Sequence, residues 1–383
     1  LAMLLSACGS QEPSGGEPEV KDTLIVGNSA EPTVLDPPNQ QNTPAGLINV
    51  QVYDGLLRQN NETGEIEPCL AESWEYVDDC TVRFHLRDDV YFHDGSKFTA
   101  EDVKFTFDRG AECIMKAMIF EPFDTSKTKI IDEYTIELGT KDVFPPFLTY
   151  LTNNATLIVS KSAVEAAGSD DVYGRNPVGT GAYKFVSYDR GVSVVLEKNP
   201  DYHMGEPDVE RLIFQVIPDS DTALQAFFNG EVDMLKGVPN SQVPALLQDP
   251  QYKLGYSSAA RRYQIAVNMQ NEKMTWEVRK AVSLAIDREE ISLKGTNGLM
   301  PPAYGFYPSY CSWAYNADAD IGERNVEEAR ALLEQAGYTL DSDGYYLELE
   351  MLVFSSGSYA DCGKVMQSNL KEAGISMKLT VLE

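Results

Sequence analysis

The sequence has few basic residues and no long apolar run, and both absences limit what the protein can do. Only 31 lysines and arginines accompany 59 aspartates and glutamates in 383 residues, which gives a formal net charge of −28 at pH 7. Such a chain repels nucleic-acid phosphates and anionic lipid headgroups, so nucleic acid is excluded as a partner. The ordinary consequence of acidity is solubility, which does not identify a ligand. No apolar run approaches the ~20 residues that a membrane-spanning helix needs.

Cysteine and histidine are also scarce and are scattered along the chain. The six cysteines include no C-x-x-C pair, and no cysteine lies at zinc-ligand spacing from another cysteine or a histidine. The histidines are His85, His93 and His203. We therefore predict no disulfide framework, no metal site and no cofactor, and we expect most thiols to pack as small apolar side chains. The cysteines are Cys8, Cys69, Cys80, Cys113, Cys311 and Cys362.

Catalytic motifs are missing as well. The sequence contains no G-x-S-x-G, no H-E-x-x-H and no Cys/His arrangement typical of hydrolases. His93 and Asp94 could form a catalytic dyad, but Gly95 completes a turn and no nucleophile motif lies nearby, so we interpret the pair as structural. The glycines of Gly179-Thr180-Gly181 lead into a strand pattern and not into a helix, which predicts a tight turn and no phosphate-binding loop. An enzyme is not expected, and a secreted lipoprotein hydrolase stays a distant alternative.

The first residues carry a signal for location. Leu5-Ser6-Ala7-Cys8 resembles the end of a bacterial lipoprotein signal peptide, in which the cysteine receives lipid. No basic segment precedes it, so we expect the sequence to begin inside the signal. The segment from Gly9 to Asp22 is rich in Ser, Gly, Pro and Glu, which is typical of a flexible tether. The pattern predicts an extracytoplasmic protein held by lipid on Cys8, in the periplasm or at the outer face of the cell membrane.

The folded part begins with mixed helix and strand signals. Thr23–Gly27 has the composition of a strand, and Ala45–Leu57 has the apolar spacing of a helix. Glu72–Arg87 alternates apolar and polar residues around Asp78-Asp79, which predicts a hairpin with one buried face. Thr99 with Asp102 three positions later predicts a capping box that opens a helix.

The second half alternates helices and strands, and this predicts a mainly parallel sheet covered by helices. A chain of this length needs two or more lobes. A further lobe starts with a helix from Thr275, continues through the loop Gly298–Pro308, and includes a helix over Val326–Ala336 that Gly337 ends. The alternating elements are helix Thr222–Asn229, strand Glu231–Leu235, helix Gln242–Gln248 and strand Tyr263–Asn268.

Ordered motifs along the chain resemble solute-binding protein family 5, the receptors of ABC importers for oligopeptides, dipeptides and, in some members, nickel chelates, haem or oligosaccharides. They begin with Leu35-Asp36-Pro37 and recur across nearly all of the chain after the tether. The clearest of the others are Tyr53-Asp54-Gly55-Leu56-Leu57, Pro68-Cys69-Leu70-Ala71-Glu72-Ser73-Trp74, Phe84-His85-Leu86-Arg87, Phe92-His93-Asp94-Gly95, and Thr99-Ala100-Glu101-Asp102-Val103.

The resemblance implies an α/β, two-lobed periplasmic-binding-protein-like (type 2) fold with an inserted subdomain in the first lobe. Family members continue beyond the last residue given, so we expect the chain to be C-terminally incomplete. The implied organisation is a signal remnant and tether at 1–22, the main part of the first lobe at 23–58 and 172–264, the inserted subdomain at 59–171, and an incomplete second lobe at 265–383.

The resemblance also implies a function without chemistry. A monomeric receptor would capture a di- or oligopeptide by closing a hinge near Tyr263–Asn268 and deliver it to ABC permease subunits. The guanidinium of Arg262 would suit a peptide carboxylate. The same role for a nickel chelate, haem or oligosaccharide stays open, as does peptide sensing. The residues expected to contact the ligand are Gln41, Thr43, Asn153, Asn154, Arg262 and Tyr263.

Overall fold

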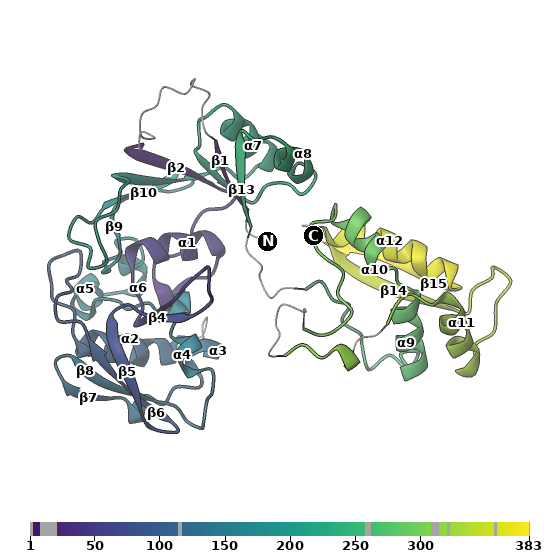
Figure 1. Cartoon of the computed structure of the whole chain (residues 1–383), viewed down its shortest axis with the longest axis horizontal. Helices are drawn as coiled ribbons and strands as arrows, with labels where there is room; N and C mark the ends of the chain where they lie inside the picture. Colours follow the sequence, from purple (N-terminus) through teal and green to yellow (C-terminus); the bar gives the residue numbers. More distant parts are fainter. Residues whose placement is uncertain are drawn as a thin grey trace. The chain divides into compact units, whose positions relative to one another are not determined.

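The computed structural model describes residues 3–7, 21–113, 117–256, 262–307, 314–319, 322–355 and 358–382. It divides into two units, which Figure 1 shows in the colours of the sequence. The N-terminal unit is Leu4–Gly237, and the C-terminal unit is Val238–Glu383 together with Leu1–Met3. The lobe boundary predicted after residue 264 lies inside the C-terminal unit, and the full domain assignment stays a prediction. Among the described helices, none is both long enough and apolar enough to cross a bilayer.

The main sheet of the N-terminal unit is mixed. Its strands follow the order β1-β12-β2-β11-β10-β9. Strand β2 runs parallel to β11 and β12, whereas β9, β10 and β11 pair antiparallel and β1 pairs antiparallel with β12. The prediction of a mainly parallel sheet is therefore wrong, because β9, β10 and β11 form an antiparallel meander. The strands are β1 (Met3–Ala7), β2 (Thr23–Asn28), β9 (Tyr183–Asp189), β10 (Ser193–Lys198), β11 (Arg211–Val216) and β12 (Met234–Lys236).

Helices of this unit begin where the sequence offers caps. The side chain of Asn42 accepts from the Ala45 amide at 3.1 Å and starts α1, which ends at Val52. The predicted continuation to Leu57 is wrong, since Leu57 begins strand β3 (Leu57–Gln59). The helices are α1 (Thr43–Val52), α2 (Ala100–Glu112), α3 (Ala117–Phe120), α4 (Phe147–Tyr150), α5 (Lys161–Ala167), α6 (Asp170–Tyr173) and α7 (Ser220–Phe228), with short 3-10 turns η1 (Pro37–Asn39), η3 (Thr125–Lys127) and η4 (Asn154–Thr156).

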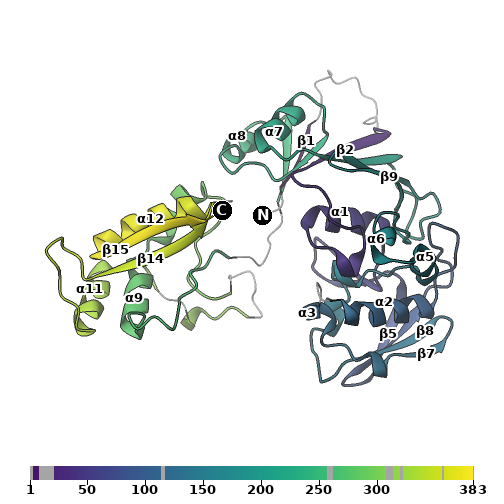
Figure 2. The ribbon, with the colours of Figure 1, turned by 180° about the vertical axis from the view of Figure 1, so that it is seen from behind.

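A second sheet, in the order β5-β6-β8-β7, lies in the same unit. The predicted hairpin is confirmed as β5 and β6, with Trp74 opposite Phe84. The capping box is also confirmed, because the Asp102 carboxylate accepts from the Thr99 amide at 3.0 Å at the start of α2. Helix α2 lies along one face of this sheet in both views (Figures 1 and 2). The strands of this sheet are β5 (Ala71–Asp78), β6 (Thr81–Leu86), β7 (Lys129–Asp132) and β8 (Thr135–Gly139), and a separate pair is formed by β3 (Leu57–Gln59) and β4 (Ile66–Pro68).

The N-terminal unit contains two hydrophobic cores. One is built from residues between Leu56 and Ile158 around the second sheet. The other joins Val26–Tyr53 to Val159–Phe214 around the main sheet. The chain thus leaves one core, forms another, and returns to the first.

The C-terminal unit has its own core, where α9, α11 and α12 meet the parallel pair β14 and β15. The predicted strand at Tyr263–Asn268 is wrong, since this segment is irregular and its alternate apolar side chains are exposed. Gly337 has φ 91° after α11, as its predicted role as a helix terminator requires. The elements are α8 (Val243–Gln248), β13 (Tyr252–Tyr256), α9 (Trp276–Ala285), α10 (Arg288–Glu290), the π-helix η5 (Ile291–Gly295), η6 (Ala317–Ala319), α11 (Val326–Gln335), β14 (Leu347–Phe354), α12 (Tyr359–Glu372) and β15 (Ile375–Leu382).

Candidate functional site

The predicted ligand residues of the N-terminal unit follow a firmly anchored turn. Asp36 is fully buried, and its carboxylate accepts from Arg109 Nη1 at 2.8 Å and Nη2 at 2.5 Å. The same guanidinium lies 2.7 Å from Asp170. Helix α2, which carries Arg109, therefore fixes the position of the segment that continues to Gln41 and Thr43.

Gln41 and Thr43 are exposed, and the structure brings them near the exposed pair Asn153 and Asn154. Turn η4 packs against η1 and α1. A Cβ atom on Gly46 of α1 would lie 3.6 Å from Asn154 Nδ2, which shows how closely the two segments approach. The oxygen of the Asn153 side chain caps the Ala155 amide at 2.9 Å. These four residues lie on neighbouring elements of one unit, and their contact with a ligand stays a prediction.

Arg262, in the C-terminal unit, is held over an aromatic ring. Its guanidinium carbon lies 3.5 Å from the ring centroid of Phe306, and Nη1 donates to the Phe306 carbonyl. Its Nε donates to Gln264 Oε1 at 3.0 Å. Within the described residues it makes no ion pair with a carboxylate, so its charge is balanced only by a carbonyl, an amide and a ring face. Such a guanidinium can bind an anionic group by donating hydrogen bonds to it.

Tyr263 belongs to an exposed aromatic cluster that the sequence did not reveal. Its ring stacks on Tyr359, with centroids 4.3 Å apart and planes 15° from parallel. Phe354 meets Tyr359 edge-on at 6.1 Å. Tyr263 is 36% exposed, Tyr359 is 39% exposed and Phe354 is 59% exposed. An exposed aromatic surface of this kind can pack against apolar or planar groups.

The structure supports the interpretation of His93 as part of a turn and not of a catalytic dyad. His93 Nε2 lies 2.9 Å from the Gly181 carbonyl, whereas Asp94 accepts from the amide and hydroxyl of Ser96. Burial lowers the pKa of His93 to about 4, against the opposing effect of the Gly181 carbonyl. Gly95 has φ 86°, which suits glycine in the turn. The neutral ring thus links this turn to the segment before β9 through its hydrogen bond with the Gly181 carbonyl.

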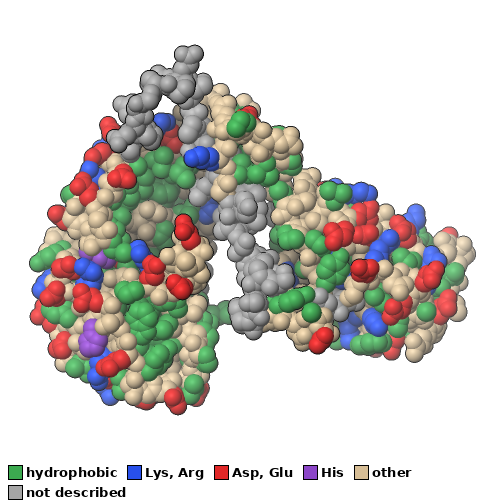
Figure 3. Space-filling model, viewed as in Figure 1, with side chains coloured by type: hydrophobic (Ala, Val, Ile, Leu, Met, Phe, Trp, Pro, Cys, Tyr) green, Lys and Arg blue, Asp and Glu red, His purple; other side chains and the backbone are tan. Residues whose placement is uncertain are grey.

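A depression of about 630 Å³ in the C-terminal unit holds none of the predicted ligand residues. Two of its four acidic side chains are in ion pairs: Glu290 pairs with Lys294 at 2.5 Å, and Glu372 pairs with Arg324 at 2.7 Å. The Asp287 side chain caps the Glu290 amide at 2.9 Å. This is a solvated charged face. Acidic and basic side chains are likewise interspersed on the surface shown in Figure 3.

The cysteines contribute no described disulfide. Cys69, Cys80, Cys113 and Cys362 are free thiols. Cys8, the predicted lipidation site, lies outside the described residues, so its lipidation stays a prediction.

Comparisons with known proteins agree with the motifs. Residues 65–383 match the family described as bacterial extracellular solute-binding proteins, family 5 Middle. The chain is 26% identical over 374 residues to a glutathione-binding protein of Salmonella typhi, covering 94% of this chain and 69% of the relative. It is 28% identical over 370 residues to a periplasmic oligopeptide-binding protein of Haemophilus influenzae, covering 88% of this chain and 68% of the relative.

Solved structures give the same result. The crystal structure of NikZ from Campylobacter jejuni in complex with Ni(L-His) matches with a TM-score of 0.78 and 26% identity, over 95% of this chain and 74% of that chain. HbpA2 from Haemophilus parasuis matches with a TM-score of 0.77 and 26% identity, over 94% and 76%. The predicted periplasmic-binding-protein-like α/β fold is confirmed. The chain belongs to the bacterial extracellular solute-binding proteins of family 5, a family of binding proteins for transport and not of enzymes.

Proposed function

We propose that this protein is the extracytoplasmic substrate-binding component of an ABC importer and that its ligand is a di- or oligopeptide. The observation that carries the proposal is the family match over residues 65–383. Relatives named for glutathione and for oligopeptides align over most of the chain, and both ligand classes contain peptide bonds and carboxylates. The permease is then the protein partner, and the receptor acts as a monomer.

The side chains of the C-terminal unit fit a peptide chemically. The guanidinium of Arg262 is held over a ring and has no carboxylate partner among the described residues. A peptide carboxylate would form an ion pair with it. The exposed rings of Tyr263 and Tyr359 would pack against an apolar side chain of the ligand. The amides of Asn153 and Asn154 in the N-terminal unit would bind peptide backbone groups. Closure of a hinge on the ligand would then present the form that the permease recognises.

Isothermal titration calorimetry of the purified protein against a library of di- to octapeptides tests the proposal. We expect heat of binding for a subset of peptides, and we expect C-terminal amidation of a bound peptide to weaken its binding because the anionic partner of Arg262 is removed. The variant Arg262→Gln should lower affinity for the free acid more than for the amide. Absence of heat with every peptide would refute the peptide assignment.

A nickel chelate is the second candidate, because the structural match includes NikZ bound to Ni(L-His). Titration with Ni²⁺ in the presence of L-histidine separates the two assignments. Binding of the chelate without binding of peptides would replace the first proposal with the second.

Lipid attachment at Cys8 is part of the same proposal, motivated by the sequence Leu5-Ser6-Ala7-Cys8. Cleavage before Cys8 would also remove strand β1 from the edge of β12. Expression of the Cys8→Ser variant should shift the protein from the membrane fraction to the soluble extracytoplasmic fraction and abolish its labelling by radioactive palmitate. Cys80→Ser is the matched control and should keep both. Membrane retention and labelling of Cys8→Ser would rule out this anchor.

A further inference from the structure

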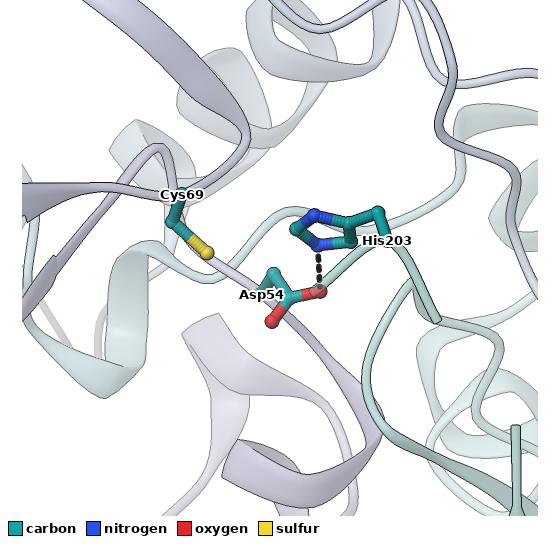
Figure 4. A group of neighbouring side chains, drawn as sticks. All are labelled: Asp54, Cys69 and His203. Carbon is teal, nitrogen blue, oxygen red and sulfur yellow. Dashed lines mark hydrogen bonds and ion pairs between the residues drawn. The ribbon is translucent and has the colours of Figure 1, made fainter. Parts of the chain in front are cut away.

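Three potential metal ligands from distant parts of the sequence meet inside the N-terminal unit (Figure 4). Asp54 follows α1, Cys69 lies between β4 and β5, and His203 lies in the turns after β10. One ligand atom from each residue lies within 4.8 Å of the other two. Asp54 is 8% exposed, Cys69 is 6% exposed, and the His203 side chain is 2% exposed. The group is therefore a built interior cluster and not a chance gathering of surface side chains.

Neighbouring groups fix the carboxylate in position. Thr180 Oγ1 donates to Asp54 Oδ2 at 2.9 Å, and Tyr202 OH donates to Oδ1 at 3.0 Å. The ring nitrogen Nε2 of His203 lies 3.1 Å from Oδ2. Hydrogen bonds to a carboxylate from outside the ligand set are the usual way in which proteins orient a metal ligand.

The cluster is incomplete in charge and in hydrogen bonding. Among the described residues, Asp54 has no lysine or arginine partner, and nearby Arg58 pairs with Glu67 at 2.8 Å. The Nδ1 atom of His203 is buried without a hydrogen-bond partner in the described part of the chain. A buried carboxylate that has hydroxyl and imidazole partners but no lysine or arginine is costly, because burial penalises an uncompensated charge. A divalent cation among the three side chains would compensate that charge.

We propose that Asp54, Cys69 and His203 supply three ligands of a zinc site in the N-terminal unit, with water in the fourth position. Zinc accepts this mixture of thiolate, imidazole and carboxylate ligands, and tetrahedral zinc with ordinary bond lengths places its ligand atoms about 3.5 Å apart. The Asp54 and His203 atoms already approach this spacing, and a side-chain shift of about 1 Å would bring in the Cys69 sulfur.

Zinc binding would break the S–H bond of Cys69 as the Sγ–Zn bond forms, and the proton would leave to solvent. Zinc would also take the place of the hydrogen bond between His203 and Asp54. The ion would tie the end of α1, the start of β5 and the turns after β10 together. This role is separate from ligand capture, so it can fail while the proposed receptor function stands.

The test uses the purified whole protein, stripped of metal by a chelator and then titrated with Zn²⁺ or Co²⁺. We expect one ion per chain, a rise in melting temperature with Zn²⁺, and a near-ultraviolet charge-transfer band from a thiolate to Co²⁺. Cys69→Ser should abolish the band, whereas Cys80→Ser, which alters a described thiol outside the cluster, should keep it. His203→Gln should weaken Zn²⁺ binding at least tenfold.

Circular dichroism of each metal-free variant separates loss of binding from loss of fold. If Cys69→Ser does not fold, X-ray absorption of the zinc-loaded wild-type protein decides, because a single sulfur neighbour is expected. Folded wild-type protein without the Co²⁺ band, or an equal band in Cys69→Ser and Cys80→Ser, would overturn the proposal.

Discussion

Replacing Arg109 by methionine should strongly destabilise the N-terminal unit. Asp36 is 0% exposed, and the guanidinium supplies two of the hydrogen bonds to its carboxylate, at 2.8 and 2.5 Å. Among the described residues, the remaining side-chain donor to Asp36 is the Asn39 amide at 2.7 Å. The methionine would fill much of the space but would leave a buried carboxylate without a cation.

The expected loss follows from this burial. Removing one partner of a buried ion pair costs about 3–5 kcal/mol, because the other charge stays desolvated and unpaired. In a unit of this size each 1 kcal/mol shifts the melting temperature by about 2–4 °C, so a decrease of roughly 6–20 °C is expected. The pair with Asp170 adds little, because the Asp170 side chain is 62% exposed.

Differential scanning calorimetry of the variant measures this decrease. Arg175→Met is the matched control, since its pair with Asp171 lies on the surface with side chains 48% and 73% exposed, and it should cost less than about 1 kcal/mol. The double variant Asp36→Leu/Arg109→Met should recover much of the loss, because no buried charge is left. A decrease for Arg109→Met no larger than that for Arg175→Met would refute the reasoning.

Three further outcomes are expected. Gly179→Ala should destabilise the N-terminal unit by about 3 kcal/mol in urea unfolding, because the new Cβ would lie 2.0 Å from the Val52 carbonyl oxygen; a loss below about 1 kcal/mol would contradict this. Burial lowers the pKa of His93 to about 4, below the ~6.5 of the unfolded chain. The unfolded state therefore binds a proton more readily than the folded state, and up to about 3 kcal/mol of stability is lost as the pH falls from 6.5 to 4. His93→Gln should flatten that part of the curve of stability against pH, and an unchanged curve would exclude the effect. Tyr263→Ala should reduce the calorimetric affinity for a bound peptide about tenfold if its ring packs on the ligand, whereas Tyr263→Phe should keep it.

Short-range signals in the sequence predicted local structure well. The capping box at Thr99 and Asp102 and the glycine at Gly337 act within one turn of chain, and both are as predicted. The prediction of a strand at Tyr263–Asn268 was wrong because alternating apolar and polar residues also occur in irregular segments. No strand among the described residues pairs with this segment. The helix expected to reach Leu57 failed because strand pairing with Pro68 captures that residue.

The candidate sites depend on contacts that spacing rules do not reach. Asp54 and His203 are 149 positions apart, so no metal motif links them, and the family motif that contains Asp54 carries no sign of a metal ligand. Tyr359 likewise carried no signal that it would stack on Tyr263. The family motifs nonetheless predicted the fold, because their order along the chain matches that of a family whose fold is known.

A receptor that closes on its ligand depends on stiff parts as well as on ligand contacts. Ligand affinity can drive closure only if the binding groups are held in place before the ligand arrives. The pair of Asp36 with Arg109 fixes the segment before Gln41, and the Asp54 cluster joins three segments that are distant in sequence. Variants in either group should therefore lower stability and ligand affinity together, although neither group is expected to touch the ligand. Tyr263→Ala should instead lower affinity with a smaller loss of stability, because its ring is partly exposed and stacks on one neighbour, and this difference separates contact residues from those that only position them.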